Sequence, residues 1–173
     1  GTMDSFIAYK LTGRFVTDTS NASRTMLFNI NTLDWDNELL EMWGIDKECL
    51  PQVVSSAEIV GECKEFSNAP LCSIIGDQQG SLVGHGAIET GRSKITYGTG
   101  GFLLVNTGSK VQLDADKLLA TVAYTVNGKT AYALEGSIFS ACSAINWAGH
   151  NIKLFDKVDE TEKMALSVPD NGG

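Results

Sequence analysis

The sequence predicts an α/β protein, because the two halves of the chain carry different hydrophobic patterns. Apolar side chains recur at helical spacing over residues 35–43, and Gly44 follows as a helix stop. Beyond residue 93, short β-rich runs alternate with turn residues, and Asn127-Gly128 is a strong two-residue hairpin turn. The change from helix-rich to strand-rich character at residues 86–91 is the expected domain boundary.

Caps, breakers and periodicity set the expected ends of each element. Asp4 is expected to cap a first helix that stops at Gly13, and Pro51 ends a short helical turn. Trp35 and Trp43 are expected to lie in the core. The expected helices cover residues 5–12, 34–43, 46–50, 78–87 and 137–152, and the expected strands cover 15–17, 71–75, 94–97, 102–106, 120–126 and 130–134.

Composition excludes several classes of function. Thirteen basic against twenty-one acidic residues give a net charge of -8, which argues against non-specific binding to nucleic acid or to an anionic membrane surface. No apolar stretch approaches the ~20 residues that span a bilayer. The four cysteines form no C-x-x-C pair, and the two histidines do not complete a zinc set with them. A reduced, cytoplasmic protein is expected.

Two segments are candidates for chemistry. The apolar run 71–75 lies between Pro70 and Gly76, and we interpret it as a buried strand that delivers Asp77 to a site. Taken alone, Asp77 is more often a helix N-cap than a base, and we expect it to cap the helix over 78–87. The second segment, 96–102, places three glycines around a threonine, so that backbone N–H groups can approach an anion closely. Together the two segments suggest a carboxylate base facing a phosphate.

Two nucleotide-binding motifs are only apparent. Gly128-Lys129-Thr130 resembles the end of a P-loop, but Ala123 stands where the first glycine of that loop is required. Gly98-Thr99-Gly100 begins a dinucleotide fingerprint, yet Leu103 stands where its third glycine is required and no helix follows. Neither a P-loop nor a Rossmann site is expected.

Five motifs in series resemble the glycerol kinase branch of the FGGY carbohydrate kinase family. They are DSFIAYKLTG at 4–13, TD with NASRTMLFNI at 17–30, GDQQ at 76–79, YGTGGF at 97–102 and YALEGS at 132–137. Members of this family are much longer, so the resemblance implies an internal fragment with a ribonuclease-H-like, actin-type α/β fold. Residues 1–90 would form the later part of the N-terminal, substrate-side domain, and residues 91–173 the beginning of the C-terminal, nucleotide-side domain.

The resemblance also implies roles for individual residues in the phosphorylation of glycerol by ATP. Asp77 resembles the catalytic base, with Gln78 as a hydroxyl-binding neighbour and Phe102 as an apolar wall of the glycerol pocket. Gly98, Thr99 and Gly100 resemble the loop that meets the nucleotide phosphates. Cys142 and Asn146 occupy nucleotide-facing positions where glycerol kinases usually carry Gly and Gln. Mg²⁺ is the expected counter-ion of the phosphates, and its protein ligands are not assigned.

The resemblance leaves alternatives open. Another polyol or sugar kinase of the same family, or a non-catalytic relative that retains the fold, would carry similar motifs. We further expect a cytoplasmic, homo-oligomeric parent protein with no membrane span. The 173-residue chain alone is expected to be inactive, because the residues that fix glycerol and adenine would lie outside it.

Overall fold

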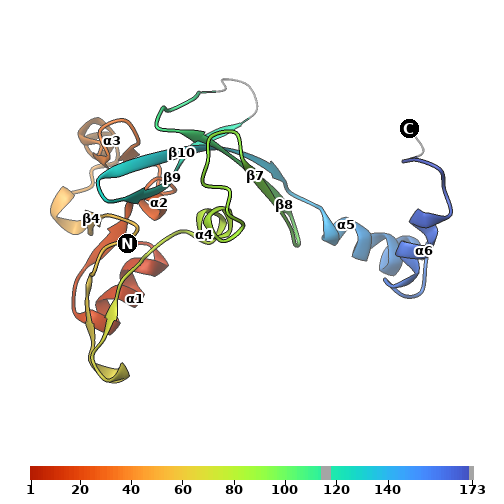
Figure 1. Ribbon diagram of the computed structural model, residues 1–173, viewed down its shortest axis with the longest axis horizontal. Helices are drawn as coiled ribbons and strands as arrows, with labels where there is room; N and C mark the ends of the chain where they lie inside the picture. Colours follow the sequence, from red (N-terminus) through yellow and green to blue (C-terminus); the bar gives the residue numbers. More distant parts are fainter. Residues whose placement is uncertain (114–117, 172–173) are drawn as a thin grey trace. The chain divides into compact units, whose positions relative to one another are not determined.

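The computed structural model describes residues 1–113 and 118–171 (Figure 1). These residues mix helices and strands and divide into two compact units. The first unit comprises Gly1–Lys94 and Leu103–Gly136, and the second comprises Ile95–Phe102 and Ser137–Gly173. The boundary expected near residue 90 concerns the domains of a longer protein and stays a prediction.

Short helices and strands alternate through most of the described chain (Figure 1). The helices are α1 (Met3–Thr12), α2 (Thr19–Ala22), α3 (Asn37–Trp43), α4 (Asp77–Gly84), α5 (Cys142–Trp147) and α6 (Glu160–Leu166), with 3-10 turns η1 (Lys47–Cys49) and η2 (Lys64–Phe66) and a π-helical turn η3 (Ala148–Ile152). The strands are β1 (Val16–Asp18), β2 (Phe28–Asn29), β3 (Asp34–Trp35), β4 (Gln52–Val54), β5 (Gly61–Cys63), β6 (Ala69–Leu71), β7 (Ser93–Tyr97), β8 (Gly101–Gly108), β9 (Leu119–Val126) and β10 (Lys129–Ile138).

The largest sheet has the strand order β7-β8-β10-β9, and β9 and β10 pair antiparallel. Strands β1 and β4 pair parallel, whereas β2 with β3 and β5 with β6 form antiparallel pairs. The predicted hairpin turn is confirmed, because Asn127 and Gly128 both have the positive φ, 51° and 71°, that this type of turn requires. Gly13 and Gly44 end α1 and α3 in the left-handed conformation, as predicted.

The expected strand at 71–75 is wrong, because only Leu71 belongs to a strand, the end of β6. The segment bonds to loop and side-chain partners instead of to a strand ladder. The Ile74 N–H and the Ser73 hydroxyl both donate to the Ser56 carbonyl, at 3.1 and 2.7 Å. The Gly76 N–H donates to the Ser20 hydroxyl at 2.9 Å. These bonds hold the chain extended up to Asp77 without a neighbouring strand.

Several helix ends also differ from the expectation. Thr2, not Asp4, is the N-cap of α1, and α3 begins at Asn37 after its cap Asp36, later than the expected start at residue 34. The last expected helix begins only at Cys142, because residues 137 and 138 continue β10. The expectation for the two tryptophans is half right: the Trp35 side chain is buried, whereas Trp43 is 62% exposed at the end of α3.

Three apolar clusters form the core of the first unit, and β9 contributes to two of them. Val122 packs with α2 and α3 residues, whereas the next residue, Ala123, packs with Leu82 of α4. Because successive side chains of a strand point to opposite faces, β9 is buried on both sides and joins the two clusters. The clusters are Ala22, Phe28, Trp35, Leu40, Val122 and Tyr132; Ala8, Val16, Val54, Val60 and Ile74; and Leu82, Ala87, Leu104, Ala123 and Ala133.

Candidate functional site

Asp77 lies in the first turn of α4, and its carboxylate is exposed. The N-cap of this helix is Gly76, so the expectation that Asp77 caps it is wrong. A Cβ at Gly76 would come within 2.5 Å of the Gln79 side-chain oxygen, so a larger residue there would force the buried Gln79 side chain to shift. The Asp77 Oδ1 accepts a hydrogen bond from the Gln78 N–H at 2.7 Å. Helix α4 ends at Gly84, three residues earlier than expected.

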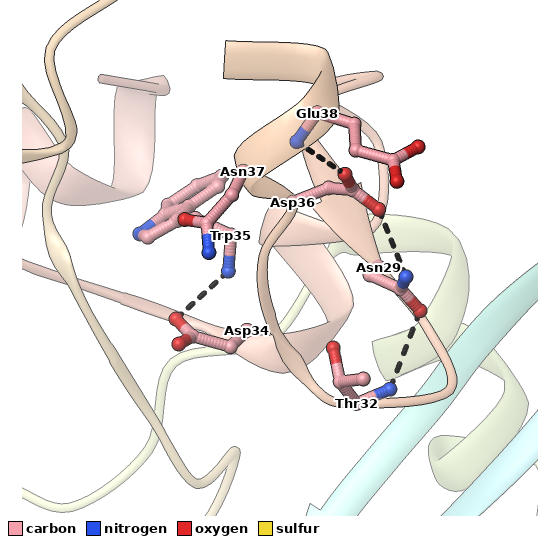
Figure 2. A pocket seen from close by; sticks show the side chains of 7 residues that line it. All are labelled: Asn29, Thr32, Asp34, Trp35, Asp36, Asn37 and Glu38. Carbon is pink, nitrogen blue, oxygen red and sulfur yellow. Dashed lines mark hydrogen bonds between the residues drawn. The ribbon is translucent and has the colours of Figure 1, made fainter. Parts of the chain in front are cut away.

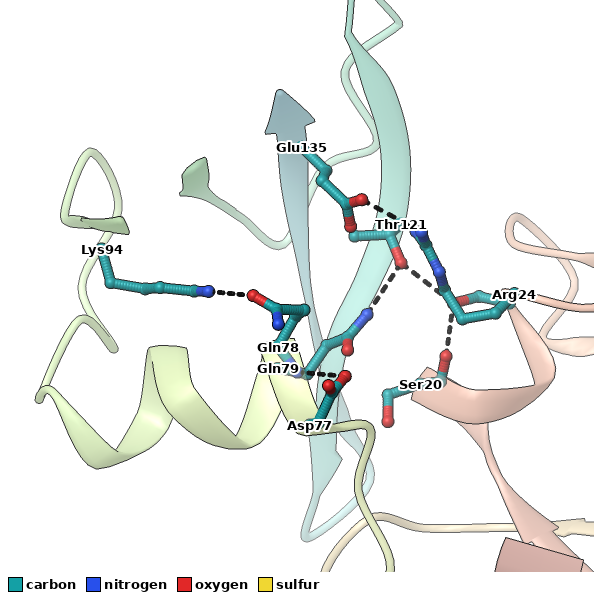
Figure 3. Close-up of polar contacts among 9 residues, drawn as sticks. Ser20, Arg24, Asp77, Gln78, Gln79, Lys94, Thr121 and Glu135 are labelled. Carbon is teal, nitrogen blue, oxygen red and sulfur yellow. Dashed lines mark hydrogen bonds and ion pairs between the residues drawn. The ribbon is translucent and has the colours of Figure 1, made fainter. Parts of the chain in front are cut away.

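The side of α4 opposite Asp77 is fixed in the interior. Leu82 is fully buried against Leu104, Ala123 and Ala133 of the sheet. Gln79 is 2% exposed and donates its amide N–H to the Thr121 hydroxyl at 3.2 Å. Figure 3 shows the Gln79 side chain reaching from α4 to the Thr121 hydroxyl on β9. The backbone that carries the carboxylate is therefore held rigidly.

Behind the segment that leads into α4 lies a buried carboxylate, Asp18, which caps α2. It accepts hydrogen bonds from the backbone N–H groups of Ser20 and Asn21, at 3.0 and 2.9 Å. The side chains of Ser20, Asn21 and Ser56 donate to it as well, at distances from 2.6 to 2.9 Å. The Ser20 hydroxyl thereby gains a fixed orientation and accepts the Gly76 N–H.

Beside Asp77, Gln78 is half-buried, and its side-chain oxygen accepts a hydrogen bond from the Lys94 ammonium (Figure 3). Lys94 is only 4% exposed. Burial lowers the pKa of Lys94 below the usual value for lysine, although the nearby carboxylates of Glu135 and Asp77 act in the opposite direction. Glu135 is 3% exposed and forms an ion pair with Arg24 at 3.0 Å.

The residues that support Asp77 and Gln78 were not predicted from the sequence. Arg24 was part of a matched motif and had no assigned role, and Gln79, Lys94 and Glu135 were not singled out. One signal was present for Lys94: it is the only charged residue of the strand run predicted at 94–97. A charged residue in such a run is a candidate for burial with a partner.

The glycine-threonine loop lies in the second unit between β7 and β8 and is joined to the start of α5. The Thr99 carbonyl accepts the Ala141 N–H and the Ser143 hydroxyl, both at 2.9 Å. Among the described residues, the Thr99 hydroxyl forms no hydrogen bond, and its side chain is exposed. A Cβ on Gly100 would meet the Ile138 carbonyl at 2.8 Å, so this position requires glycine.

The remaining candidates on the nucleotide side lie on or beside this loop. The Cys142 N–H donates to the Gly98 carbonyl at 3.1 Å, and the Gly98 N–H donates to the Gly100 carbonyl at 2.8 Å. The Gly98 amide is thus engaged within the loop. Asn146 is exposed one turn after Cys142 on the same face of α5. The half-buried Phe102 ring lies beside Gly100.

The structure gathers the candidates into two sets. Asp77 and Gln78 belong to the first unit, and the loop, Phe102, Cys142 and Asn146 belong to the second. The expectation that the carboxylate faces the loop stays a prediction. Within the described residues, no three His, Cys, Asp or Glu side chains gather in a way that could hold a metal ion. None of the helices in residues 1–113 and 118–171 has the length and apolar character needed to cross a membrane.

A surface hollow lies where the β2-β3 hairpin meets α3, and Figure 2 shows its acidic lining. Its carboxylates are used for local structure. Asp36 accepts the Asn29 amide at 2.8 Å and the Glu38 N–H at 3.0 Å, and these hydrogen bonds lower the pKa of Asp36. Asp34 binds Lys47 at 2.8 Å, which lowers the pKa of Asp34. We assign no chemistry to this hollow.

Comparison with known proteins agrees with the fold and with the motifs. Residues 1–84 match the model of the FGGY family of carbohydrate kinases, N-terminal domain. The whole chain is 50% identical to the glycerol kinase of Thermococcus gammatolerans and covers 36% of that protein. Among solved structures, 98% of the chain superposes on 35% of the Plasmodium falciparum glycerol kinase with ADP, with a TM-score of 0.91 and 36% identity. The ligand-bound xylulose kinase of Lactobacillus acidophilus matches 96% of the chain, with a TM-score of 0.82 and 26% identity, over 35% of its own length.

Proposed function

Because this chain belongs to the FGGY family of carbohydrate kinases, we propose that it is part of an ATP-dependent glycerol kinase. The fold is the predicted ribonuclease-H-like, actin-type α/β fold, which the chain shares with kinases of this family. The chain spans about a third of the length of its relatives, so the activity is proposed for a protein of their length, called here the full-length protein.

The observation that carries this proposal is the exposed Asp77 carboxylate on a rigid helix start, in a chain that is 50% identical to a glycerol kinase. In the proposed reaction, Asp77 accepts the proton of a glycerol hydroxyl while the oxygen of that hydroxyl bonds to the γ-phosphorus of ATP. The bond between that phosphorus and the β–γ bridging oxygen breaks, and ADP leaves. The products are glycerol 3-phosphate and ADP.

The other candidates receive roles that their surroundings support. Gln78 would bind a second hydroxyl of glycerol, and Phe102 would form an apolar wall. The exposed Thr99 hydroxyl would donate to a phosphate oxygen beside Gly98 and Gly100. Cys142 and Asn146, on one face of α5, would line the nucleotide side, where ADP binding by the Plasmodium falciparum relative supports a nucleotide.

Mg²⁺ is proposed to accompany the nucleotide, where its charge offsets the phosphates. The described residues hold no cluster of three acidic, histidine or cysteine side chains, so no residue of this chain is assigned to the ion. Mg²⁺ in kinases is held largely by phosphates and water with one or two carboxylates, so a small protein contribution is sufficient.

The family suggests the wider setting of the full-length protein. We propose a cytoplasmic homo-oligomer in which residues 1–90 belong to the substrate-side domain and residues 91–173 to the nucleotide-side domain. The match of the family's N-terminal model to residues 1–84 supports this division. The 173-residue chain alone should not phosphorylate glycerol, because phosphoryl transfer needs groups from both domains held in line.

The direct test is a kinase assay of the full-length protein with ATP and a panel of glycerol, xylulose and gluconate. We expect ADP release with glycerol, and much less with either sugar compound. Preference for xylulose or gluconate would favour another activity of the same family. Binding of glycerol without turnover at any ATP concentration would favour a non-catalytic relative and contradict the proposal.

A further inference from the structure

We propose that Lys94 is a positioning residue that fixes the side-chain amide of Gln78 so that the NH₂ group, not the oxygen, faces the substrate. This inference rests on the proposed function, because it assumes that a polyol binds beside Asp77. It concerns a lysine that lies behind the two candidate residues and that the proposed reaction does not use.

The burial of Lys94 is the first observation. Lys94 is 4% exposed, whereas its strand neighbours Ser93 and Ile95 are exposed. The Lys94 side chain therefore lies on the buried face of β7. A buried lysine is costly unless its nitrogen has partners. Its ammonium donates to the side-chain oxygen of Gln78, sixteen residues earlier in the chain at the start of α4.

The charges around Lys94 decide which end of the amide it binds. Burial lowers the pKa of Lys94, and the carboxylates of Glu135 and Asp77 favour its protonated form. An ammonium group has donors and no acceptor, so it can bind only the oxygen of the Gln78 amide. Since the oxygen is held inward at Lys94, the NH₂ group of Gln78 lies at the other end of the amide and is left to act as a donor.

This orientation gives the site two different hydrogen-bonding groups side by side. The Asp77 carboxylate accepts a hydrogen bond, and the Gln78 NH₂ group donates one. A compound with two adjacent hydroxyls satisfies both groups, because one hydroxyl donates to Asp77 and the oxygen of the next accepts from Gln78. Lys94 would thus help to select vicinal diols, although it does not touch them.

A double-mutant cycle in the full-length protein tests the inference. Gln78→Met removes the amide and keeps the length of the side chain, and Lys94→Met removes the ammonium and keeps most of the apolar stem. Each single variant should raise the KM for glycerol about tenfold, with the KM for ATP unchanged. Gln78→Met removes the hydrogen bond to glycerol, and Lys94→Met releases the amide that makes this bond. The double variant should be no worse than either single one, since Lys94 acts through Gln78.

Lys47→Met is the matched control, because Lys47 is an exposed lysine whose ion pair with Asp34 lies at the β3-η1 surface. It should leave both KM values unchanged. A roughly hundredfold rise of the glycerol KM in the double variant would show independent effects and overturn the inference. An unchanged glycerol KM in Lys94→Met, with a raised KM in Gln78→Met, would overturn it as well.

A readout without turnover separates this inference from the proposed function. A wild-type protein that phosphorylates no polyol contradicts the proposed function. In that case the side-chain amide resonances of Gln78 still test whether Lys94 positions the amide. In ¹⁵N-glutamine-labelled protein these resonances are identified by their loss in Gln78→Met. They should shift strongly in Lys94→Met and stay in place in Lys47→Met. Unshifted Gln78 resonances in Lys94→Met would rule out the positioning role.

Discussion

Asp18 and Asp77 both stand at the start of a helix in the first unit, yet their surroundings are opposite. Asp18 is fully buried, and backbone and side-chain donors from Ser20, Asn21 and Ser56 converge on its carboxylate. Asp77 is exposed, and it accepts the N–H of the next residue, Gln78. The first carboxylate is saturated with hydrogen bonds, whereas the second keeps capacity for a ligand.

The contrast distinguishes a carboxylate that builds the site from one that acts in it. Asp18 orients Ser20, and Ser20 accepts the backbone N–H of Gly76, the residue before Asp77. A fixed backbone lets an exposed side chain keep a defined position without hydrogen bonds that would compete with a substrate. The hydrogen bonds of Asp18 thus fix the backbone before Asp77, and the Asp77 carboxylate stays accessible to a ligand.

The largest effect on stability is expected for Asp18→Ala. The substitution leaves several buried donors without an acceptor and removes the cap of α2, so we expect a loss of roughly 3–5 kcal/mol of unfolding free energy. Denaturant unfolding of the full-length protein measures this loss. Asp34→Ala is the control: its exposed ion pair with Lys47 should contribute less than about 1 kcal/mol. Equal losses in the two variants would contradict the structural role of Asp18.

A smaller effect, on binding, is expected for Thr99→Val, which extends the contrast to the second unit. The exposed Thr99 hydroxyl resembles Asp77 in having capacity for a ligand. Valine keeps the branched shape and removes the donor, so nucleotide affinity should fall by roughly 1.5–3 kcal/mol, as for a hydrogen bond to a charged group. Calorimetric titration with ATP measures it, and Thr99→Ser should retain the affinity. Unchanged affinity in the valine variant would make Thr99 a turn residue only.

The smallest effect, on stability, is expected at Gly100, which like Asp18 has a structural role. In Gly100→Ala the new Cβ would meet the Ile138 carbonyl at 2.8 Å, so we expect a loss of about 1–3 kcal/mol from overpacking. In Gly98→Ala the nearest atom would be the Gly100 carbonyl oxygen at 3.8 Å, an ordinary contact. Thermal unfolding compares the two variants. A Gly98→Ala variant that is as destabilised as Gly100→Ala would show that the close contact does not set the requirement.

Local signals predicted much of the fold. The hairpin at Asn127-Gly128 and the helix stops at Gly13 and Gly44 depend on backbone conformations that few residues adopt, so the residue type alone indicates them. The strand at 71–75 was wrongly predicted because an apolar run does not show which groups its backbone will bond to, and of this run only Ile74 is buried. That partner is the Ser56 carbonyl, which the sequence does not connect to this segment.

The candidate site was predicted in part, for a similar reason. The motifs around Asp77 and Thr99 are short and contiguous, and therefore visible in one sequence. Lys94, Gln79 and Glu135 reach the site from β7, α4 and β10, and only tertiary packing brings the lysine to the Gln78 amide and the glutamate to Arg24. A pattern along the chain cannot show which buried polar groups find each other across a sheet.

The most direct test of the proposed role of Asp77 is the turnover of Asp77→Asn in the full-length protein, measured beside its stability. Asparagine keeps the oxygen that accepts the Gln78 N–H, and the site is exposed, so unfolding free energy should stay within about 0.5 kcal/mol of wild type. Turnover with glycerol and ATP should fall by about 10²–10⁴-fold, because the proton acceptor is lost. A folded Asp77→Asn protein that turns glycerol over at the wild-type rate would contradict the account.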